Sequence, residues 1–359
     1  MSRFLSLLLA LLASAPIFAG DKTSVSVTPV SQDPDAVNGG VIYALPKTVV
    51  RVKLTARAVV STAGPFFKYS TRCLNLSDVV TENSTRWSLV SAEVSTVGVP
   101  DYSQRFKVSV SDVSLMPAIS LSDCGVLLSV NGESDYATPA ESATAVVPAY
   151  ANFDDVQVPH SVIARTSTAA MAEECANVIY ALRDSRIDLI SGDKNVSLPD
   201  AGAYKRALSE IDRQEAQLVS LFAGRRDTVF VERFVDIYPD ENGSSNVVPV
   251  RFSESTGFVE ATDLSGKPVY VDLEYADVQA LNAFPDGSKQ RKAAPVDGLR
   301  YYVPAVLLVR VSDRNIPLCQ CSVRCSQTAS VASLPAALLL SHRIVLNPAD
   351  GSLVSISPK

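Results

Sequence analysis

Three of the six cysteines in the chain lie within CQCSVRC, at positions 319–325. Thiols at such spacing can bind a metal ion, form disulfides or exchange electrons, and C-x-C-x3-C would offer zinc three ligands, with His342 as a conceivable fourth. On a strand, Cys319 and Cys321 point to one face about 6.6 Å apart. Their parallel Cβ directions do not suit a bond between the two, although each could pair with a cysteine elsewhere. We therefore predict that Cys319, Cys321 and Cys325 form a thiol cluster or contribute to a disulfide, and buried unpaired thiols, a metal site and a redox site stay open as alternatives.

The chain carries few groups that could act as a catalytic base. Its two histidines are His160, in an expected linker, and His342, at the start of an expected strand. A serine hydrolase needs a base beside its nucleophile, and the sequence has no G-x-S-x-G motif. It also lacks H-E-x-x-H and both glycine-rich phosphate-binding motifs. We therefore assign no catalytic residue, no cofactor site and no metal ligand.

Carboxylates and aromatic rings are the remaining candidates for a site. A glycoside hydrolase can draw its two carboxylates from distant strands. Acidic residues in or beside expected strands are Asp101, Glu232, Asp236, Asp272 and Glu274. Nothing in their spacing selects a pair. A carbohydrate-binding surface uses exposed aromatic rings, and the adjacent Tyr301 and Tyr302 would direct one ring outward on a strand, so both are predicted as ligand-facing candidates.

Strand periodicity dominates the first part of the mature chain. TVVRVKLTARAVV, at 48–60, alternates apolar with polar residues, which is typical of a half-buried antiparallel strand. Further strands are expected at 87–99, 105–111 and 125–131, separated by turns that include 99–103 and 131–135. Residues 20–160 are therefore predicted to form an N-terminal β-rich domain.

The pattern changes to a helical period in residues 161–226. Apolar residues recur at helical spacing from Thr168 to Ile190 and again from Tyr204 to Phe222, with a glycine just beyond. About ten residues separate these two helices, so we expect an antiparallel helical hairpin. Arg186 and Glu215 interrupt the apolar stripes, and we expect them to extend past the helix edges or to pair with a β domain.

Residues 227–359 return to strand periodicity, with turn sequences at DENGSSN and ADG. Their short strands favour a C-terminal β-sandwich-like domain. The chain is thus expected to be an α+β protein in which two β-rich, sandwich-like domains flank the helical hairpin.

The first nineteen residues, MSRFLSLLLALLASAPIFA, have the pattern of a secretory signal peptide, because Arg3 precedes an apolar run and small residues follow. We expect residues 1–19 to be removed on export. No later apolar run is long enough to span a bilayer. The net charge of −6 does not favour non-specific binding of nucleic acid.

Several stretches together resemble one family. In chain order they are VIYALPKT at 41–48, AGPFFKYS at 63–70, VPD at 99–101, ALRDSRIDLISGD at 181–193, residues 199–224, GLRYYVP at 298–304 and LNPADGSL at 346–353. The family is an uncharacterised group of exported Bacteroidetes proteins, described as domain of unknown function 4831. The resemblance implies an envelope or secreted location in a Gram-negative anaerobe, and it implies no reaction. The chain departs from the family pattern at CSVRCSQTAS, so the cysteines look particular to this protein.

The sequence therefore favours an exported cell-envelope protein, of unknown specific function, that acts by interaction or assembly and not by catalysis. It is expected in the periplasm, attached to the outer membrane, or secreted. Its partner is expected to be an envelope protein or a glycan, and not nucleic acid. One alternative is a carbohydrate- or surface-ligand-binding module, and another is a carboxylate- or metal-dependent hydrolase.

Overall fold

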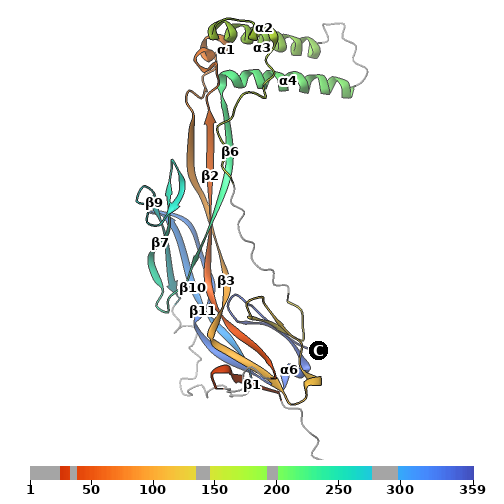
Figure 1. Ribbon diagram of the computed structural model, residues 1–359, viewed down its shortest axis with the longest axis vertical. Helices are drawn as coiled ribbons and strands as arrows, with labels where there is room; N and C mark the ends of the chain where they lie inside the picture. The colour runs from red at the N-terminus through yellow and green to blue at the C-terminus, as the bar shows by residue number, and fades with distance from the viewer. Residues whose placement is uncertain (1–24, 33–38, 135–145, 192–200, 277–297) are drawn as a thin grey trace, which may run out of the picture.

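The computed structural model describes residues 25–32, 39–134, 146–191, 201–276 and 298–359. The expected signal peptide at 1–19 lies outside these residues. Strands make up more of the described chain than helices do, as expected for a β-rich protein. The molecule is elongated, and its longer helices gather at one end (Figure 1).

One antiparallel sheet runs along much of the molecule, in the strand order β1-β3-β2-β6. Its strands are β1 Val25–Pro29, β2 Val41–Thr62, β3 Ser84–Val110 and β6 Arg225–Ile237, and the short 3-10 turn η1 Val30–Gln32 follows β1. We call β2, β3 and β6 the stalk. At about 3.3 Å per residue, the 27 residues of β3 extend over roughly 90 Å. The predicted alternation holds in β2, where Val52 and Leu54 are buried.

The predicted turn at 99–103 is wrong, because β3 continues through it. Pro100 lies opposite Pro46, at an irregularity in the pairing of β2 with β3. Proline cannot donate to a strand ladder, and such irregularities are where it is tolerated. The strands expected at 87–99 and 105–111 are consequently one strand.

Helices form a group at one end of the stalk, which we call the head. Its members are η2 Phe67–Tyr69, α1 Ser70–Leu74, α2 His160–Ile163, α3 Thr168–Ser191 and α4 Ala201–Ala223. Helices α3 and α4 lie side by side and run across the direction of the stalk (Figure 1). Their apolar sides meet in a core that includes Ile179, Leu221 and Phe222. Gly224 has a φ of +82°, which lets the chain leave α4 and enter β6 directly.

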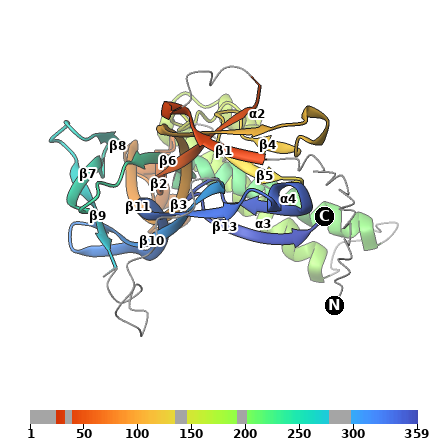
Figure 2. The ribbon, with the colours of Figure 1, turned by 90° about the horizontal axis from the view of Figure 1, so that it is seen from below.

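A second sheet packs on one face of the stalk, in the order β11-β10-β9-β7-β8. Its strands are β7 Ser244–Ser253, β8 Gly257–Glu260, β9 Lys267–Tyr275, β10 Gly298–Asp313 and β11 Ile316–Pro335. We call it the central sheet. A shared core joins the stalk's Val52 and Leu54 to Val271 and Val309. Seen from below, β7, β8 and β9 project to one side of the stalk, while α3 and α4 extend to the other (Figure 2).

A third, small sheet closes the end of the molecule opposite the head, in the order β13-β12-β5-β4. Its elements are β4 Ile119–Leu121, β5 Leu127–Val130, β12 His342–Leu346 and β13 Leu353–Pro358, with η3 Val113–Leu115 and α6 Leu338–Ser341 beside them. We call it the base sheet. Leu127, Leu299 and Ile344 share its core with residues of the stalk and the central sheet.

Strand pairing connects residues on both sides of the predicted boundary at 226/227. β6 follows that boundary almost entirely, yet it pairs with β2 along its whole length. In the base sheet, β12 pairs with β5. The first and last parts of the chain therefore build two of the three sheets together.

Candidate functional site

The C-terminal half of α3 exposes three large apolar side chains. Tyr180, Ile187 and Ile190 are 45%, 61% and 55% exposed. Spacings of seven and three residues place them along one side of the helix. We call this set the head stripe. The buried side of α3 is set by other residues, among them Ala172 and Ile179.

Ion pairs fix α3 against α4 beside the head stripe. Arg183 Nε donates to Glu215 Oε1 at 2.7 Å, and Arg186 Nε donates to Asp212 Oδ1 at 2.7 Å. Arg186 and Glu215 therefore do not pair with a β domain, since each has its partner on the neighbouring helix. The Arg183 guanidinium also lies over the ring of Tyr180, 5.6 Å from its centroid. These contacts hold the stripe on a fixed surface.

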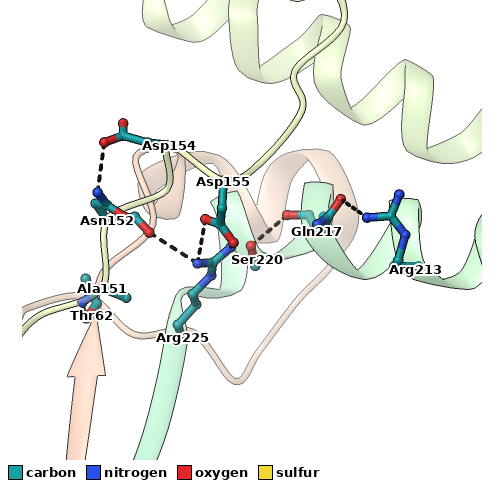
Figure 3. Close-up of polar contacts among 9 residues, drawn as sticks. All are labelled: Thr62, Ala151, Asn152, Asp154, Asp155, Arg213, Gln217, Ser220 and Arg225. Carbon is teal, nitrogen blue, oxygen red and sulfur yellow. Dashed lines mark hydrogen bonds and ion pairs between the residues drawn. The ribbon is translucent and has the colours of Figure 1, made fainter. Parts of the chain in front are cut away.

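Residues 146–159, which we call the strap, bind the end of the stalk next to the head (Figure 3). Arg225, the first residue of β6, donates from Nη1 and Nη2 to the two carboxylate oxygens of Asp155, at 2.8 and 3.0 Å. Its Nη1 also donates to the carbonyl oxygen of Asn152 at 3.1 Å. The guanidinium carbon lies 4.9 Å from the ring centroid of Phe153. One side chain at the start of β6 therefore holds the strap by charge, hydrogen bonds and ring contact.

The loop at 346–353 docks where the three sheets meet, and we call this place the junction. The Tyr302 backbone N–H donates to the Gly351 carbonyl at 2.8 Å. The Thr48 hydroxyl donates to the Ala349 carbonyl at 2.9 Å, and Thr48 is fully buried. The loop is therefore bound to both β2 and β10.

Most of the stretches that resemble the family lie at the junction or in the head. Those at 41–48, 99–101, 298–304 and 346–353 lie at or beside the junction. The stretch at 63–70 and the described part of 199–224, from residue 201 on, meet in the head, where the Phe66 N–H donates to the Leu221 carbonyl at 2.9 Å. The contacts described here hold sheets and helices together and do not gather reactive groups.

The predicted cysteines lie on β11 and face the core between the stalk and the central sheet. Cys319 and Cys321 pack against that core on one face, and Cys325 is completely buried in it. All six cysteines of the chain are free thiols. Burial raises the pKa of Cys325, and burial together with the neighbouring thiol of Cys319 raises the pKa of Cys321. A neutral buried thiol is a poor nucleophile and a poor metal ligand.

The predicted tyrosines sit in a core and not on an open platform. Tyr302 is 7% exposed and belongs to the base-sheet core, and Tyr301 is half-buried against the same cluster. Of the two histidines, His160 begins α2. The Nδ1 of His342 lies 2.8 Å from the Ser341 hydroxyl. No ion pair of His342 is formed among the described residues.

Most of the candidate carboxylates are engaged by cations or backbone groups. Asp236 is paired with Arg51 at 2.7 Å, and Glu232 lies 3.7 Å from the Lys53 ammonium. Asp272 accepts the Asn246 N–H at 2.7 Å. These three carboxylates therefore have structural partners on neighbouring strands.

Asp101 is the buried member of this group. Burial alone would raise its pKa, but hydrogen bonds from Ser103 and the charge of Lys47 outweigh burial and hold the pKa below its usual value. The described residues contain no group of three or more His, Cys, Asp or Glu side chains placed to hold a metal ion.

Sequence reasoning did not single out the head stripe. Ile190 is the last residue of the predicted apolar stripe of α3, yet it is exposed, and Tyr180 and Ile187 lie outside that stripe. A helical wheel already places Tyr180 and Ile187 together, off the side that contains Ile179. Among the described helices, none combines the length and the apolarity needed to cross a membrane.

Comparison with known proteins identifies the family without a function. No curated protein and no solved structure matches the chain. The family model described as domain of unknown function, DUF4831, matches residues 39–354. This range covers most of the chain and includes the stalk, the head, the central sheet and most of the base sheet. The family resemblance is confirmed, and the chain belongs to the DUF4831 family.

Proposed function

We propose that this protein is an exported cell-envelope component that acts by interaction or assembly, without catalysis, and that the head is its contact surface. The head stripe of Tyr180, Ile187 and Ile190 carries the proposal. It is an apolar surface, held by ion pairs, at the far end of a long stalk. Exposed apolar groups on a rigid element are typical of protein interfaces.

The proposal includes the finer architecture. Helices α3 and α4 would act as one antiparallel hairpin, and the β-rich parts as sandwich-like layers. Pairing of Arg183 with Glu215 and of Arg186 with Asp212, in opposite chain directions, supports the hairpin. The core shared by the stalk and the central sheet supports the layers. An elongated support of this kind would hold the head away from the base sheet.

Export is part of the same proposal and rests on the N-terminal sequence. Residues 1–19 would be cleaved, and the mature protein would reside in the periplasm, at the outer membrane or outside the cell. The partner would be an envelope protein or a glycan. Cell fractionation with mass spectrometry of the mature N-terminus tests export, and a cytoplasmic protein that retains residue 1 would contradict it.

The head is tested by a double substitution, Ile187→Ser with Ile190→Ser. The variant and the wild type are each cross-linked in native envelopes, and the linked proteins are quantified by mass spectrometry. We expect the double variant to lose at least one partner that the wild type captures, because the apolar contact is removed. The matched control is Leu264→Ser, which alters a side chain that is 79% exposed in a turn beside the central sheet. Equal capture by all three proteins would contradict the role of the head.

A further inference from the structure

A cavity of about 540 Å³ opens on the stalk near the head, and its composition points to a ligand. Three arginines line it: Arg57 from β2, Arg86 from β3 and Arg226 from β6. The volume lies within the roughly 300–1,000 Å³ that is typical of small-molecule sites. We call this cavity the stalk pocket.

Arg57 and Arg86 face the same side of the stalk and lie close together. In the pairing of β2 with β3, Arg57 is opposite Ser88 and Arg86 is opposite Val59. The two arginines are therefore diagonal neighbours on adjacent strands, with Cα atoms roughly 7–8 Å apart. Like charges at this separation repel one another. A single anion between them would relieve that repulsion.

Neither of these two arginines has a partner in the described part of the chain, whereas the other cations of the stalk do. Arg226, at the edge of the pocket, is paired with Asp78 at 2.6 Å, and Lys53 is paired with Glu93 at 2.7 Å. Neither the Arg57 nor the Arg86 guanidinium forms an ion pair or a hydrogen bond among the described residues. Two free guanidinium groups are thus concentrated in one pocket.

The pocket also contains an acidic residue. Glu82 lines it, and within the described residues its carboxylate forms no ion pair with either arginine. Its charge offsets only one of the two unpaired cations. The local balance therefore still favours an anion.

The remaining lining offers hydroxyl groups. Ser61, Ser84 and Ser88 lie on the strand faces that carry the arginines. The Trp87 side chain lies on the opposite face, opposite Ala58, and its ring packs on Gly257 and the core of the central sheet. Guanidinium forks bind carboxylate and sulfate, and serine hydroxyls bind sugar hydroxyls.

We propose that the stalk pocket binds an acidic saccharide, with its carboxylate or sulfate group held between Arg57 and Arg86. This site is separate from the head stripe and does not depend on the proposed function. Carboxylate and sulfate are alternative forms of the same oxyanion chemistry. The experiment therefore offers both.

Binding is measured by calorimetry on the mature protein with four probes: an oligogalacturonate, a sulfated disaccharide prepared from heparin, an uncharged oligosaccharide of matched length, and inorganic sulfate alone. We expect one or both acidic saccharides to bind, the uncharged one not to bind, and sulfate alone to bind more weakly. Arg57→Ala and Arg86→Ala should each weaken binding roughly tenfold or more, since each removes charged hydrogen bonds. Raising the salt concentration from about 50 to about 200 mM should weaken it further.

The matched control is Arg324→Ala, which removes an exposed arginine on the central sheet that has no partner among the described residues. This variant should bind like the wild type. The proposal is overturned if neither acidic saccharide binds, if the uncharged probe binds equally well, if inorganic sulfate binds as tightly as the saccharides, or if Arg324→Ala weakens binding as much as the pocket variants. Thermal unfolding of each variant separates a lost site from a lost fold, because both pocket arginines are exposed.

Discussion

Thr48 and Ser326 form reciprocal hydrogen bonds at the junction. The Ser326 N–H donates to the Thr48 hydroxyl at 3.0 Å, and the Thr48 N–H donates to the Ser326 hydroxyl at 2.8 Å. Both residues are buried, at 0% and 4% exposure. Unpaired polar groups at this depth would be costly, so such reciprocal bonds fix β2 against β11 in one arrangement.

Gly98 provides the closest backbone approach at the junction. A Cβ there would overlap the carbonyl oxygen of Pro348, which belongs to the docked loop at 346–353. The loop cannot withdraw easily, because it is hydrogen-bonded to both Thr48 and Tyr302. We predict that Gly98→Ala lowers the free energy of unfolding by about 1–3 kcal/mol.

Denaturant unfolding of the purified variants measures this loss. The matched control is Gly132→Ala, where the new Cβ would meet only the flexible side chain of Arg343. This obstacle can move, so the control should lose much less stability. If Gly98→Ala were as stable as the wild type, the loop would not be held in the way described.

At the scale of elements, the strap couples the head to the stalk. It lies against the start of β6, and the Ala151 N–H donates to the Thr62 hydroxyl, at the end of β2, at 3.0 Å. Arg225 then holds Asn152 and Asp155 (Figure 3). We call these Arg225 contacts the clamp. Because β6 begins directly after α4, the clamp fixes the strap to the base of the head.

We predict that Asp155→Asn loosens the strap without unfolding the central sheet. Arg225 holds the pKa of Asp155 below its usual value, chiefly by a side-chain hydrogen bond. The clamp is thus intact at neutral pH and is lost as pH falls through the lowered pKa. Hydrogen exchange at pH 7 should show faster exchange in residues 151–158 of the variant, and unchanged exchange in β10.

Arg226→Ala is the matched control for the strap. Arg226 is the next residue of β6 and is paired in the same two-pronged way, but its partner is Asp78, outside the strap. Its loss should leave exchange in residues 151–158 as in the wild type. Equal exchange in Asp155→Asn and the wild type would show that the clamp does not hold the strap.

At the scale of the whole molecule, local sequence patterns predict where strands and helices lie better than they predict which strands pair with each other. The alternation at 48–60 identifies a strand within β2, and the helical period from Thr168 identifies α3, because burial of one side produces a periodic pattern of apolar residues. Pairing between distant strands produces no such pattern. For this reason the partnership of β6 with β2 and the continuity of β3 past Pro100 were not predicted.

The features of the candidate sites divide in the same way into those that follow from local periodicity and those that depend on contacts between distant residues. The common face of Cys319 and Cys321 follows from the strand period of two and agrees with their packing. The grouping of Arg57 with Arg86 requires the register of two strands, which the sequence does not state. The outward direction of Ile190 depends on which side of α3 meets α4, and that is decided by packing in the head.

The interleaved pairing predicts that the two parts of the chain do not fold separately. A fragment of residues 227–359 would keep the central sheet, but its portion of β6 would lose β2, and β12 would lose β5. A fragment of residues 20–226 would lack both β12 and the loop at 346–353 that binds Thr48. Each fragment would expose a large apolar surface and unpaired strand edges.

We therefore expect neither fragment alone to unfold cooperatively, whereas the chain from residue 20 to residue 359 should do so. Circular dichroism during thermal unfolding and the dispersion of amide proton signals measure this difference. The intact chain under the same conditions is the control. A cooperative transition with well-dispersed signals from residues 227–359 alone would show that the last part of the chain is an autonomous domain. The stalk would then be an accessory to that domain's folding and not a requirement for it.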